Sequence, residues 1–252
     1  MIELKTPQEL AHMRRAGIVV AKMLEAASQA VAPGVKTKTL DQVAADVMTR
    51  EGAQPAFKGY RGYPATICIS INDEVVHGIP GDRVIRAGDV ISIDAGAKVS
   101  GYYADAAVTV AVGPVPRASQ RLIEITKDAL AQGITRATLD HRLGDISHTV
   151  QEVVEGAGLS IVRDFVGHGI GRALHEDPPI PNFGLPHQGP RLKPGMVLAI
   201  EPMVTMGGWE VEVLADGWTA VTKDHSLAAH FEHTVAVTDH GPEILTHVGS
   251  LN

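Results

Sequence analysis

The chain has 252 residues, enough for one large domain; 44% of them are hydrophobic, 20% are charged, and the formal net charge is −7. The sequence contains no run of Lys or Arg of the kind that indicates nucleic-acid binding. It also contains no uncharged apolar stretch that reaches the ~20 residues of a membrane helix. The N-terminus lacks the pattern of a signal peptide, and the single cysteine, Cys68, excludes an internal disulfide, so we expect a cytoplasmic protein.

The first predicted element is a helix that begins at Thr6-Pro7-Gln8-Glu9. Thr followed three residues later by Glu is typical of a capping box, and Pro suits the first helical position. Apolar residues recur at helical spacing as far as Leu24, and Pro33-Gly34 ends the run. A second helix is expected from near Thr39 to before Gly52. Apolar runs that predict strands follow at 65–71, 89–95 and 105–112.

Two aspartates interrupt the last two of these runs, although Asp is disfavoured in strand interiors. A turn-like stretch at Val99–Gly101 separates Asp94 from Asp105. If the runs form a hairpin, the two side chains lie roughly opposite each other, where cross-strand β-carbons are only ~5 Å apart. Two buried carboxylates at that distance require a positive partner, so we interpret them as ligands of a cation. The alternative is one exposed Asp and one turn-associated Asp.

Two segments of the first half are echoed in the second half. Residues 34–41, GVKTKTLD, resemble residues 133–140, GITRATLD, and residues 88–94, GDVISID, resemble residues 195–201, GMVLAIE. The offsets of 99 and 107 residues are similar, although chance can supply either short match. We interpret the pattern as a single domain over 1–252. Its two related halves, roughly 1–115 and 116–252, would turn their strands toward a shared centre.

The repeat also pairs the acidic residues of the two halves. Asp94 and Glu201 each end a Gly-x-Val-x-x-Ile run, and Asp105 and Glu232 each open a later strand. Each acid alone could be a solvated strand end, but the paired placement favours one common site. His168 lies between the two acid pairs in a segment with glycines at 167, 169 and 171, which would let the backbone approach a ligand closely.

Two more histidines are candidates for catalysis. His175 lies in the same glycine-rich segment as His168. His77 precedes a Gly-Ile-Pro turn, which is a loop position suited to catalysis. The alternative for His77 is an exposed loop imidazole without a catalytic role. Four carboxylates and one imidazole suit two divalent ions of the manganese, iron, cobalt or zinc group. Such a pair can activate water and polarise a carbonyl, as amide hydrolysis requires. The competing H-E-x-x-H, G-x-S-x-G and G-x-x-x-x-G-K-[ST] motifs are absent.

At these residues the chain resembles the methionine aminopeptidases, in their short type I bacterial form. The resemblance covers nearly the whole length and rests on INDEVVHGIP, DVISIDAGAKVSGYYADAAVT, GHGIGRALHEDP, GMVLAIEPM and FEHTVAVT. It implies the α+β pita-bread fold, in which two duplicated halves form a central curved antiparallel sheet flanked by helices. It also implies hydrolytic removal of the initiator methionine from nascent chains whose second residue is small.

The resemblance assigns a role to each candidate residue. The two metal ions would be bound by five ligands: Asp94, Asp105, His168, Glu201 and Glu232. Asp105 and Glu232 would bridge the ions, and Glu201 would also relay the proton of the attacking water. His175 would stabilise the oxyanion of the intermediate, and His77 would hydrogen-bond at the scissile amide.

The methionine side chain would occupy an apolar, aromatic pocket that suits a thioether. Its lining, by position in the family pattern, would be Tyr60, Tyr63, Cys68, His77 and Trp218. The chain departs from the pattern at two places. Leu174 stands where Phe is usual and widens the pocket wall, and His230 replaces a residue that is commonly Gln.

Two other functions share parts of this pattern. Xaa-Pro aminopeptidases and prolidases would have the same five ligands, but they normally carry an extra N-terminal domain, and here the first ligand is already residue 94. A non-catalytic binding protein of the same fold would typically lack ligands that this chain has. The resemblance implies nascent polypeptide N-termini as partners, the ribosome as a candidate partner, and a monomer.

Overall fold

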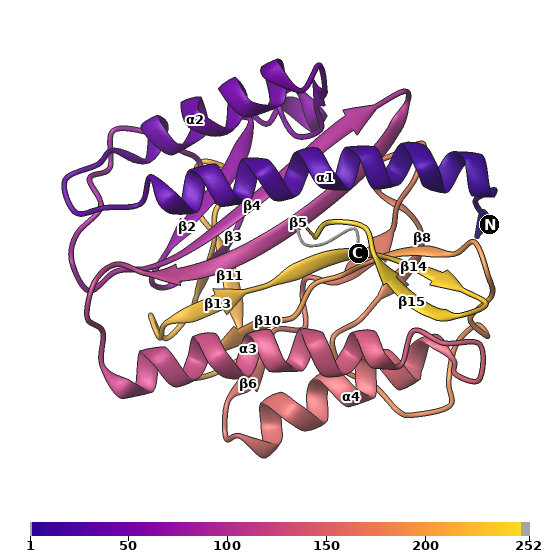
Figure 1. The fold of residues 1–252 in the computed structure, drawn as a ribbon. Helices are drawn as coiled ribbons and strands as arrows, with labels where there is room; N and C mark the ends of the chain where they lie inside the picture. Colours follow the sequence, from indigo (N-terminus) through magenta and orange to yellow (C-terminus); the bar gives the residue numbers. More distant parts are fainter. Residues whose placement is uncertain (1, 248–252) are drawn as a thin grey trace.

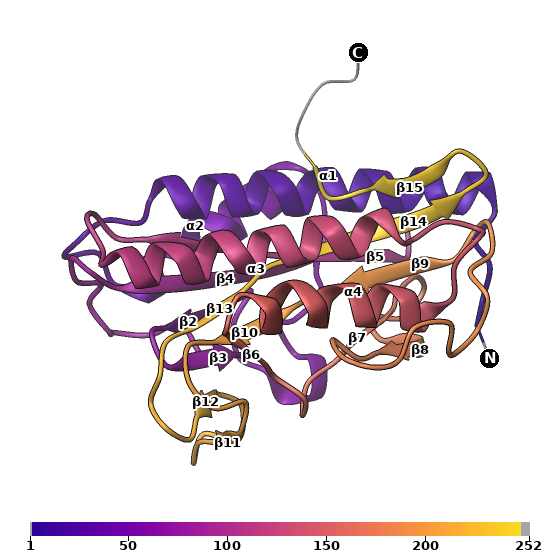
Figure 2. The same cartoon turned by 90° about the horizontal axis from the view of Figure 1, so that it is seen from below.

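The computed structural model describes residues 2–247. Four helices lie along one face of a nine-stranded antiparallel sheet (Figures 1 and 2). The helices are α1 (Pro7–Gln29), α2 (Thr37–Arg50), α3 (Arg117–Thr135) and α4 (Leu143–Gly156). None of the helices between residues 2 and 247 is both long enough and apolar enough to cross a bilayer.

The main sheet has the order β1-β4-β5-β14-β9-β7-β8, with β2 also paired to β4 and β15 to β14. Its strands are β1 (Gln54–Pro55), β2 (Ile67–Ile71), β4 (Val90–Val99), β5 (Tyr102–Ala111), β7 (Gly167–Gly169), β8 (Glu176–Ile180), β9 (Val197–Ile200), β14 (Glu232–Thr238) and β15 (Gly241–Ile244). One smaller sheet joins β6 (Ser160–Ile161), β10 (Met203–Thr205) and β13 (Ala228–His230). The other joins β3 (Glu74–Val76), β11 (Val211–Val213) and β12 (Ala220–Thr222).

The core lies between the helices and the sheet. In one half, Met23 of α1 and Leu40 of α2 pack in the same buried cluster as Ile93 of β4. In the other half, Ile146 of α4 packs in a cluster with Leu198 of β9. Because neighbouring residues of a strand point to opposite faces, the residues next to these core positions point away from the helices.

The predicted capping box forms at the start of α1. The Thr6 hydroxyl accepts a hydrogen bond from the Glu9 backbone N–H at 3.3 Å, and the Glu9 carboxylate accepts one from the Thr6 N–H at 2.8 Å. The helix ends at Gln29, before the predicted stop at Pro33-Gly34. The second helix begins two residues before Thr39, its expected start.

The predicted hairpin is formed by β4 and β5, which are joined by a two-residue turn. Ser100 and Gly101 both have positive φ, at 51° and 87°, as tight hairpin turns require. The register places Asp105 opposite Gly96, and Asp94 opposite Ala107. The two aspartates therefore lie roughly opposite each other on one face of the sheet, as predicted, and the register makes them diagonal neighbours.

The structure corrects one of the two sequence echoes. Gly34 lies beyond the end of α1 with a φ of 90°, whereas its counterpart Gly133 lies inside α3 and packs against Val150. The helices correspond instead through Lys36 and Arg142, which are the N-cap residues of α2 and α4 and each form an isolated β-bridge. The offset between Lys36 and Arg142 differs by only one residue from the 107-residue offset of the other echo. The similarity between residues 34–41 and 133–140, with its offset of 99, is therefore out of register with the helices.

The carboxylate of the capping box is expected to stabilise the fold in a pH-dependent way. Hydrogen bonds from the Thr6 backbone and from the Tyr102 hydroxyl lower the pKa of Glu9 to about 2. A lowered pKa stabilises the folded state fully above the unfolded value near 4.5, and this stabilisation is lost as the pH falls toward 2. We expect Glu9→Gln to reduce the free energy of unfolding in urea by about 1 kcal/mol at pH 7.

The difference between wild type and Glu9→Gln should shrink at pH 3, where the wild-type carboxylate begins to lose its advantage. Glu25→Gln, an exposed change on the same helix, is the matched control and should have little effect at either pH. A Glu9→Gln effect that is equal at pH 7 and pH 3 would contradict the assignment.

Candidate metal centre

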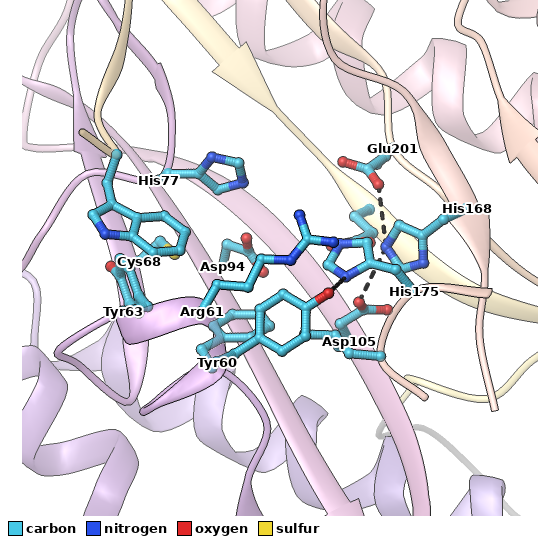
Figure 3. A pocket seen from close by; sticks show the side chains of 14 residues that line it. Tyr60, Arg61, Tyr63, Cys68, His77, Asp94, Asp105, His168, His175 and Glu201 are labelled. Carbon is cyan, nitrogen blue, oxygen red and sulfur yellow. Dashed lines mark hydrogen bonds and ion pairs between the residues drawn. The ribbon is translucent and has the colours of Figure 1, made fainter. Parts of the chain in front are cut away.

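All eleven residues predicted for the site line one cavity of about 160 Å³ on the sheet face that points away from the helices (Figure 3). They are Tyr60, Tyr63, Cys68, His77, Asp94, Asp105, His168, His175, Glu201, Trp218 and Glu232. Leu174 also lines the cavity. Phe57 and Arg61 complete the lining and were missed, although their position beside Tyr60 in the sequence was a usable signal.

The four acids come from four adjacent strands. Asp94 lies on β4, Asp105 on β5, Glu232 starts β14, and Glu201 follows the last residue of β9. Ala107 is opposite both Asp94 and Glu232, so these two side chains share its face. Asp105 is two residues from Ala107 and therefore points the same way. The strand order thus brings the acids of the two halves together.

His168 completes the cluster from the next strand, β7. Its Nδ1–H donates to the Gly169 carbonyl at 2.9 Å, which leaves Nε2 to face the carboxylates. Nε2 lies 3.5 Å from Asp105 Oδ2 and 3.5 Å from Glu201 Oε1. Asp105, His168 and Glu232 offer ligand atoms that all lie within 4.8 Å of one another, which suits one metal ion.

The electrostatics of the cluster favour bound cations. Burial and the charge of Asp105 raise the pKa of Asp94, and burial and neighbouring acids raise the pKa values of Glu201 and Glu232. Burial also raises the pKa of Asp105 to about 7. Asp94 Oδ1 is buried and has no hydrogen-bond partner. These oxygen-rich donors fit divalent ions, which would relieve the repulsion and satisfy the unpaired oxygen.

The glycines beside His168 are required by the packing of the protein itself. None of the three has a positive φ, and a side chain at each would collide with atoms of the protein. A β-carbon on Gly167 or Gly169 would lie within 2.5 Å of the carbonyl oxygen of Ala199 or Asp177, respectively. The close approaches that the structure shows are therefore to neighbouring backbone and to the Lys5 side chain, which passes over Gly171.

A buried ion pair positions the loop that carries His175. Lys5 Nζ, from the segment before α1, contacts Glu176 Oε2 at 2.6 Å, and the Lys5 side chain is only 2% exposed. Next to Glu176, His175 Nδ1 shares a hydrogen bond with the Tyr60 hydroxyl at 2.9 Å, and the two rings stack. In the tautomer in which Nδ1 accepts this bond, the His175 hydrogen is on Nε2 and available to a substrate.

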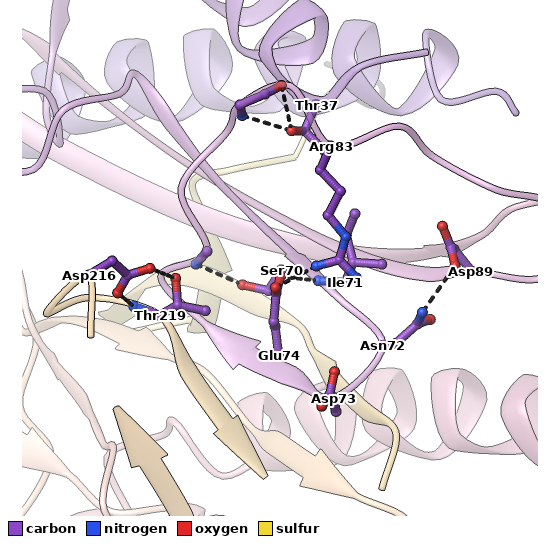
Figure 4. Close-up of polar contacts among 12 residues, drawn as sticks. Thr37, Ser70, Ile71, Asn72, Asp73, Glu74, Arg83, Asp89, Asp216 and Thr219 are labelled. Atoms are coloured by element: carbon purple, nitrogen blue, oxygen red, sulfur yellow. Dashed lines mark hydrogen bonds and ion pairs between the residues drawn. The ribbon is translucent and has the colours of Figure 1, made fainter. Parts of the chain in front are cut away.

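A polar network holds the loop of His77 (Figure 4). The Glu74 carboxylate accepts from the Ile71 backbone at 2.8 Å and pairs with Arg83. The Ser70 hydroxyl accepts from the N–H of Gly78, directly after His77, at 3.1 Å. His77 itself has a φ of 61°, and burial lowers its pKa to about 4, so its ring is neutral near pH 7.

The remaining pocket wall is apolar. Trp218 is held by Asp216, whose carboxylate accepts from the Trp218 backbone N–H at 2.8 Å. The Trp218 and Tyr63 rings meet edge to face, with their centroids 5.0 Å apart. Burial and, to a lesser extent, the charge of Asp94 raise the pKa of Cys68, which therefore stays a neutral thiol. The wall next to the metal ligands can accept an apolar or thioether side chain.

The fold and the set of donor side chains define the class of this protein as a metal-dependent hydrolase. Residues 11–239 match the model of metallopeptidase family M24, and the chain belongs to this family. Methionine aminopeptidase 1 of Bacillus subtilis is 52% identical over 248 residues, which are 98% of this chain and 100% of that protein. The Mycobacterium tuberculosis methionine aminopeptidase 1 is 49% identical and aligns over 94% of this chain and 92% of that protein. Within family M24, the chain therefore groups with the methionine aminopeptidases.

Solved structures confirm the predicted pita-bread fold. The methionine aminopeptidase of Thermotoga maritima superposes with a TM-score of 0.97 at 46% identity, covering 98% of this chain and 100% of that one. The prolidase of Pyrococcus furiosus shares the fold at a TM-score of 0.80 and 24% identity. This chain covers only 66% of that prolidase, as expected for proteins with an additional domain.

Metal binding is expected to weaken as the pH falls. Because the pKa of Asp105 is raised to about 7, protons compete with a cation for this carboxylate below neutral pH. For one competing proton we expect the apparent affinity for Mn²⁺ to fall roughly 50-fold between pH 7 and pH 5. Titration calorimetry in buffers of different ionisation enthalpy should also detect proton release on binding. Asp105→Asn should bind Mn²⁺ much more weakly, and pH-independent binding by the wild type would contradict the assignment.

Proposed function

We propose that this protein removes the N-terminal methionine from nascent proteins and peptides whose second residue is small, by hydrolysis of the first peptide bond. The observation that carries the proposal is the convergence of five metal-binding side chains on a cavity with one apolar, aromatic wall. Amide hydrolysis needs an activated water and a polarised carbonyl, and two divalent ions supply both when bound. The apolar wall supplies a place for the methionine side chain.

We assign the five ligands to the two ions as follows. Asp105 and Glu232 would be shared by both ions, which agrees with their central place on the adjacent strands β5 and β14. Asp94 would complete one set of ligands. His168 and Glu201, whose Nε2 and Oε1 atoms are 3.5 Å apart, would complete the other. The physiological metal, among cobalt, manganese, iron and zinc, is not distinguished by this donor set.

Three side chains would handle protons and charge. Glu201, which is 14% exposed toward the cavity, would take the proton of the attacking water. His175, with its hydrogen on Nε2, would donate to the developing oxyanion. The neutral ring of His77, opposite on the cavity wall, would donate to the scissile amide (Figure 3). The loops of both histidines are held by buried polar contacts, so the groups are positioned before substrate binds.

The pocket would be lined by Tyr60, Tyr63, Cys68, His77 and Trp218. Edge contacts of the Trp218 ring with Tyr63 and His77 support this assignment, because they close the apolar wall around Cys68. Leu174, which is 3% exposed, occupies the position beside His175. Its smaller side chain leaves more room there than Phe would.

We also propose that residues 1–252 form one domain of two related halves. The order β2-β4-β5 in one half mirrors the order β7-β9-β14 in the other, and β5 pairs with β14 between them. The nascent-chain substrate further supports a cytoplasmic location and action near the ribosome. The residues of one chain are sufficient for the proposed chemistry, and we expect the protein to act as a monomer.

Substrate preference tests the proposed function directly. Protein reconstituted with Co²⁺ or Mn²⁺ should release methionine from Met-Ala-Ser, act far more slowly on Met-Leu-Ser and leave Ala-Pro peptides uncut. Chromatography of the products gives the rates. The main alternative, an Xaa-Pro aminopeptidase, predicts the reverse order, and preferential cleavage before proline would overturn the proposal.

Loss of Glu201 tests the assignment of the general base. Glu201→Ala should reduce turnover of Met-Ala-Ser by at least roughly 10²-fold, since a positioned acid–base group contributes 10²- to 10⁴-fold. Circular dichroism should show an intact fold, because the side chain faces the cavity and not the helix-covered core. Glu212→Ala, at an exposed position of β11, is the control and should keep full activity. Full activity of Glu201→Ala would show that the ligand assignment is wrong.

A further inference from the structure

His230, the last residue of β13, is buried beside the metal centre without an evident purpose. It is 2% exposed, and its Nε2 is buried with no hydrogen-bond partner. An unsatisfied buried polar atom destabilises the fold, and native structures contain few of them. His230 is neither one of the five ligands nor part of the cavity lining.

The backbone of His230 is held firmly, so the direction of its ring is determined by the fold. The Thr109 hydroxyl of β5 accepts from the His230 N–H at 2.9 Å and donates to the His230 carbonyl at 2.7 Å. On its other side, His230 pairs with Met203 of β10, which lies beside β13 (Figure 1). Met203 follows Glu201 by two residues, and this pairing brings the ring close to Glu201.

The nearest charged atom to the unpaired nitrogen is an oxygen of Glu201. His230 Nε2 lies 3.7 Å from Glu201 Oε2, while the other oxygen, Oε1, lies 3.5 Å from His168 Nε2. Asn182 donates to the Glu201 main-chain carbonyl at 2.9 Å and so holds the backbone but not the carboxylate. The carboxylate thus has one oxygen directed toward the ligands and one toward His230.

We propose that His230 is a positioning residue for Glu201. A hydrogen on Nε2 would be donated to Oε2 after a movement of a few tenths of an ångström, which brings the pair within hydrogen-bond distance. This bond directs Oε1 toward His168 and the metal ligands, and it satisfies the unpaired nitrogen. Groups that orient a metal-binding carboxylate typically contribute 10- to 100-fold to metal affinity or activity. The inference rests on the role proposed for Glu201.

Two variants of His230 separate hydrogen bonding from packing. His230→Leu keeps much of the volume but removes the donor, whereas His230→Gln keeps an N–H donor. With Mn²⁺ and Met-Ala-Ser, His230→Leu should lower kcat roughly 10- to 100-fold with little change in KM, and should weaken Mn²⁺ binding measured by calorimetry. His230→Gln should retain most of both properties.

The matched control is His233→Leu. His233 lies on β14 but on the helix-covered side of the sheet, where its Nδ1 contacts the Thr246 hydroxyl at 2.9 Å, away from the cavity. It should alter thermal stability without altering kcat or Mn²⁺ affinity. Melting temperatures of all the variants separate loss of folding from loss of positioning.

Each other outcome overturns the proposal. Unchanged kcat and Mn²⁺ affinity in His230→Leu would show that the contact with Glu201 does not matter. Equal losses in His230→Leu and His230→Gln would assign the effect to ring packing, and a lower Mn²⁺ stoichiometry in both would make His230 a metal ligand. These results are distinct from failure of the role proposed for Glu201, which would appear as full activity of Glu201→Ala, and from failure of the proposed function, which would appear as preferential cleavage before proline.

Discussion

The arrangement of this protein depends on one electrostatic constraint: four carboxylates are gathered in a site that is largely closed to water. Burial raises the pKa values of all four, repulsion by neighbouring acids raises those of Asp94, Glu201 and Glu232 further, and Asp94 has an oxygen without a hydrogen-bond partner. Such a cluster is unfavourable unless cations neutralise it. The fold tolerates the cluster because its packing comes from the opposite face of the sheet, where alternate residues of the same strands meet four helices.

The order of the strands in the sheet brings the four carboxylates together at one site. The two halves of the chain meet where β5 pairs with β14, and each half brings one acid from its central strand and one from the strand beside it. Ligands on adjacent, mutually hydrogen-bonded strands have little freedom to move, which favours a preorganised metal centre. The two histidines proposed to contact substrate lie on loops instead, and buried contacts such as Lys5 with Glu176 restrict those loops.

Patterns in the sequence were sufficient for the features that depend on local order. The capping box and the hairpin could be predicted because each depends on residues close together in the chain, and the candidate ligands could be proposed because they recur in a motif. The echo of residues 34–41 in 133–140 failed because a short similarity carries no information about helix register. The packing at the glycines near His168 could not be predicted either, because the atoms next to them belong to Lys5 and Asp177 and are brought near only by folding.

The sequence by itself determined the kinds of elements, the candidate ligands and the resemblance to a metallopeptidase family. Only the tertiary structure decided which atoms of those residues face one another. The diagonal placement of Asp94 and Asp105 follows from the hairpin register, and the contact of His230 with Glu201 follows from the pairing of β13 with β10. Register and strand pairing are set by packing between distant segments, so no local pattern of residue types specifies them.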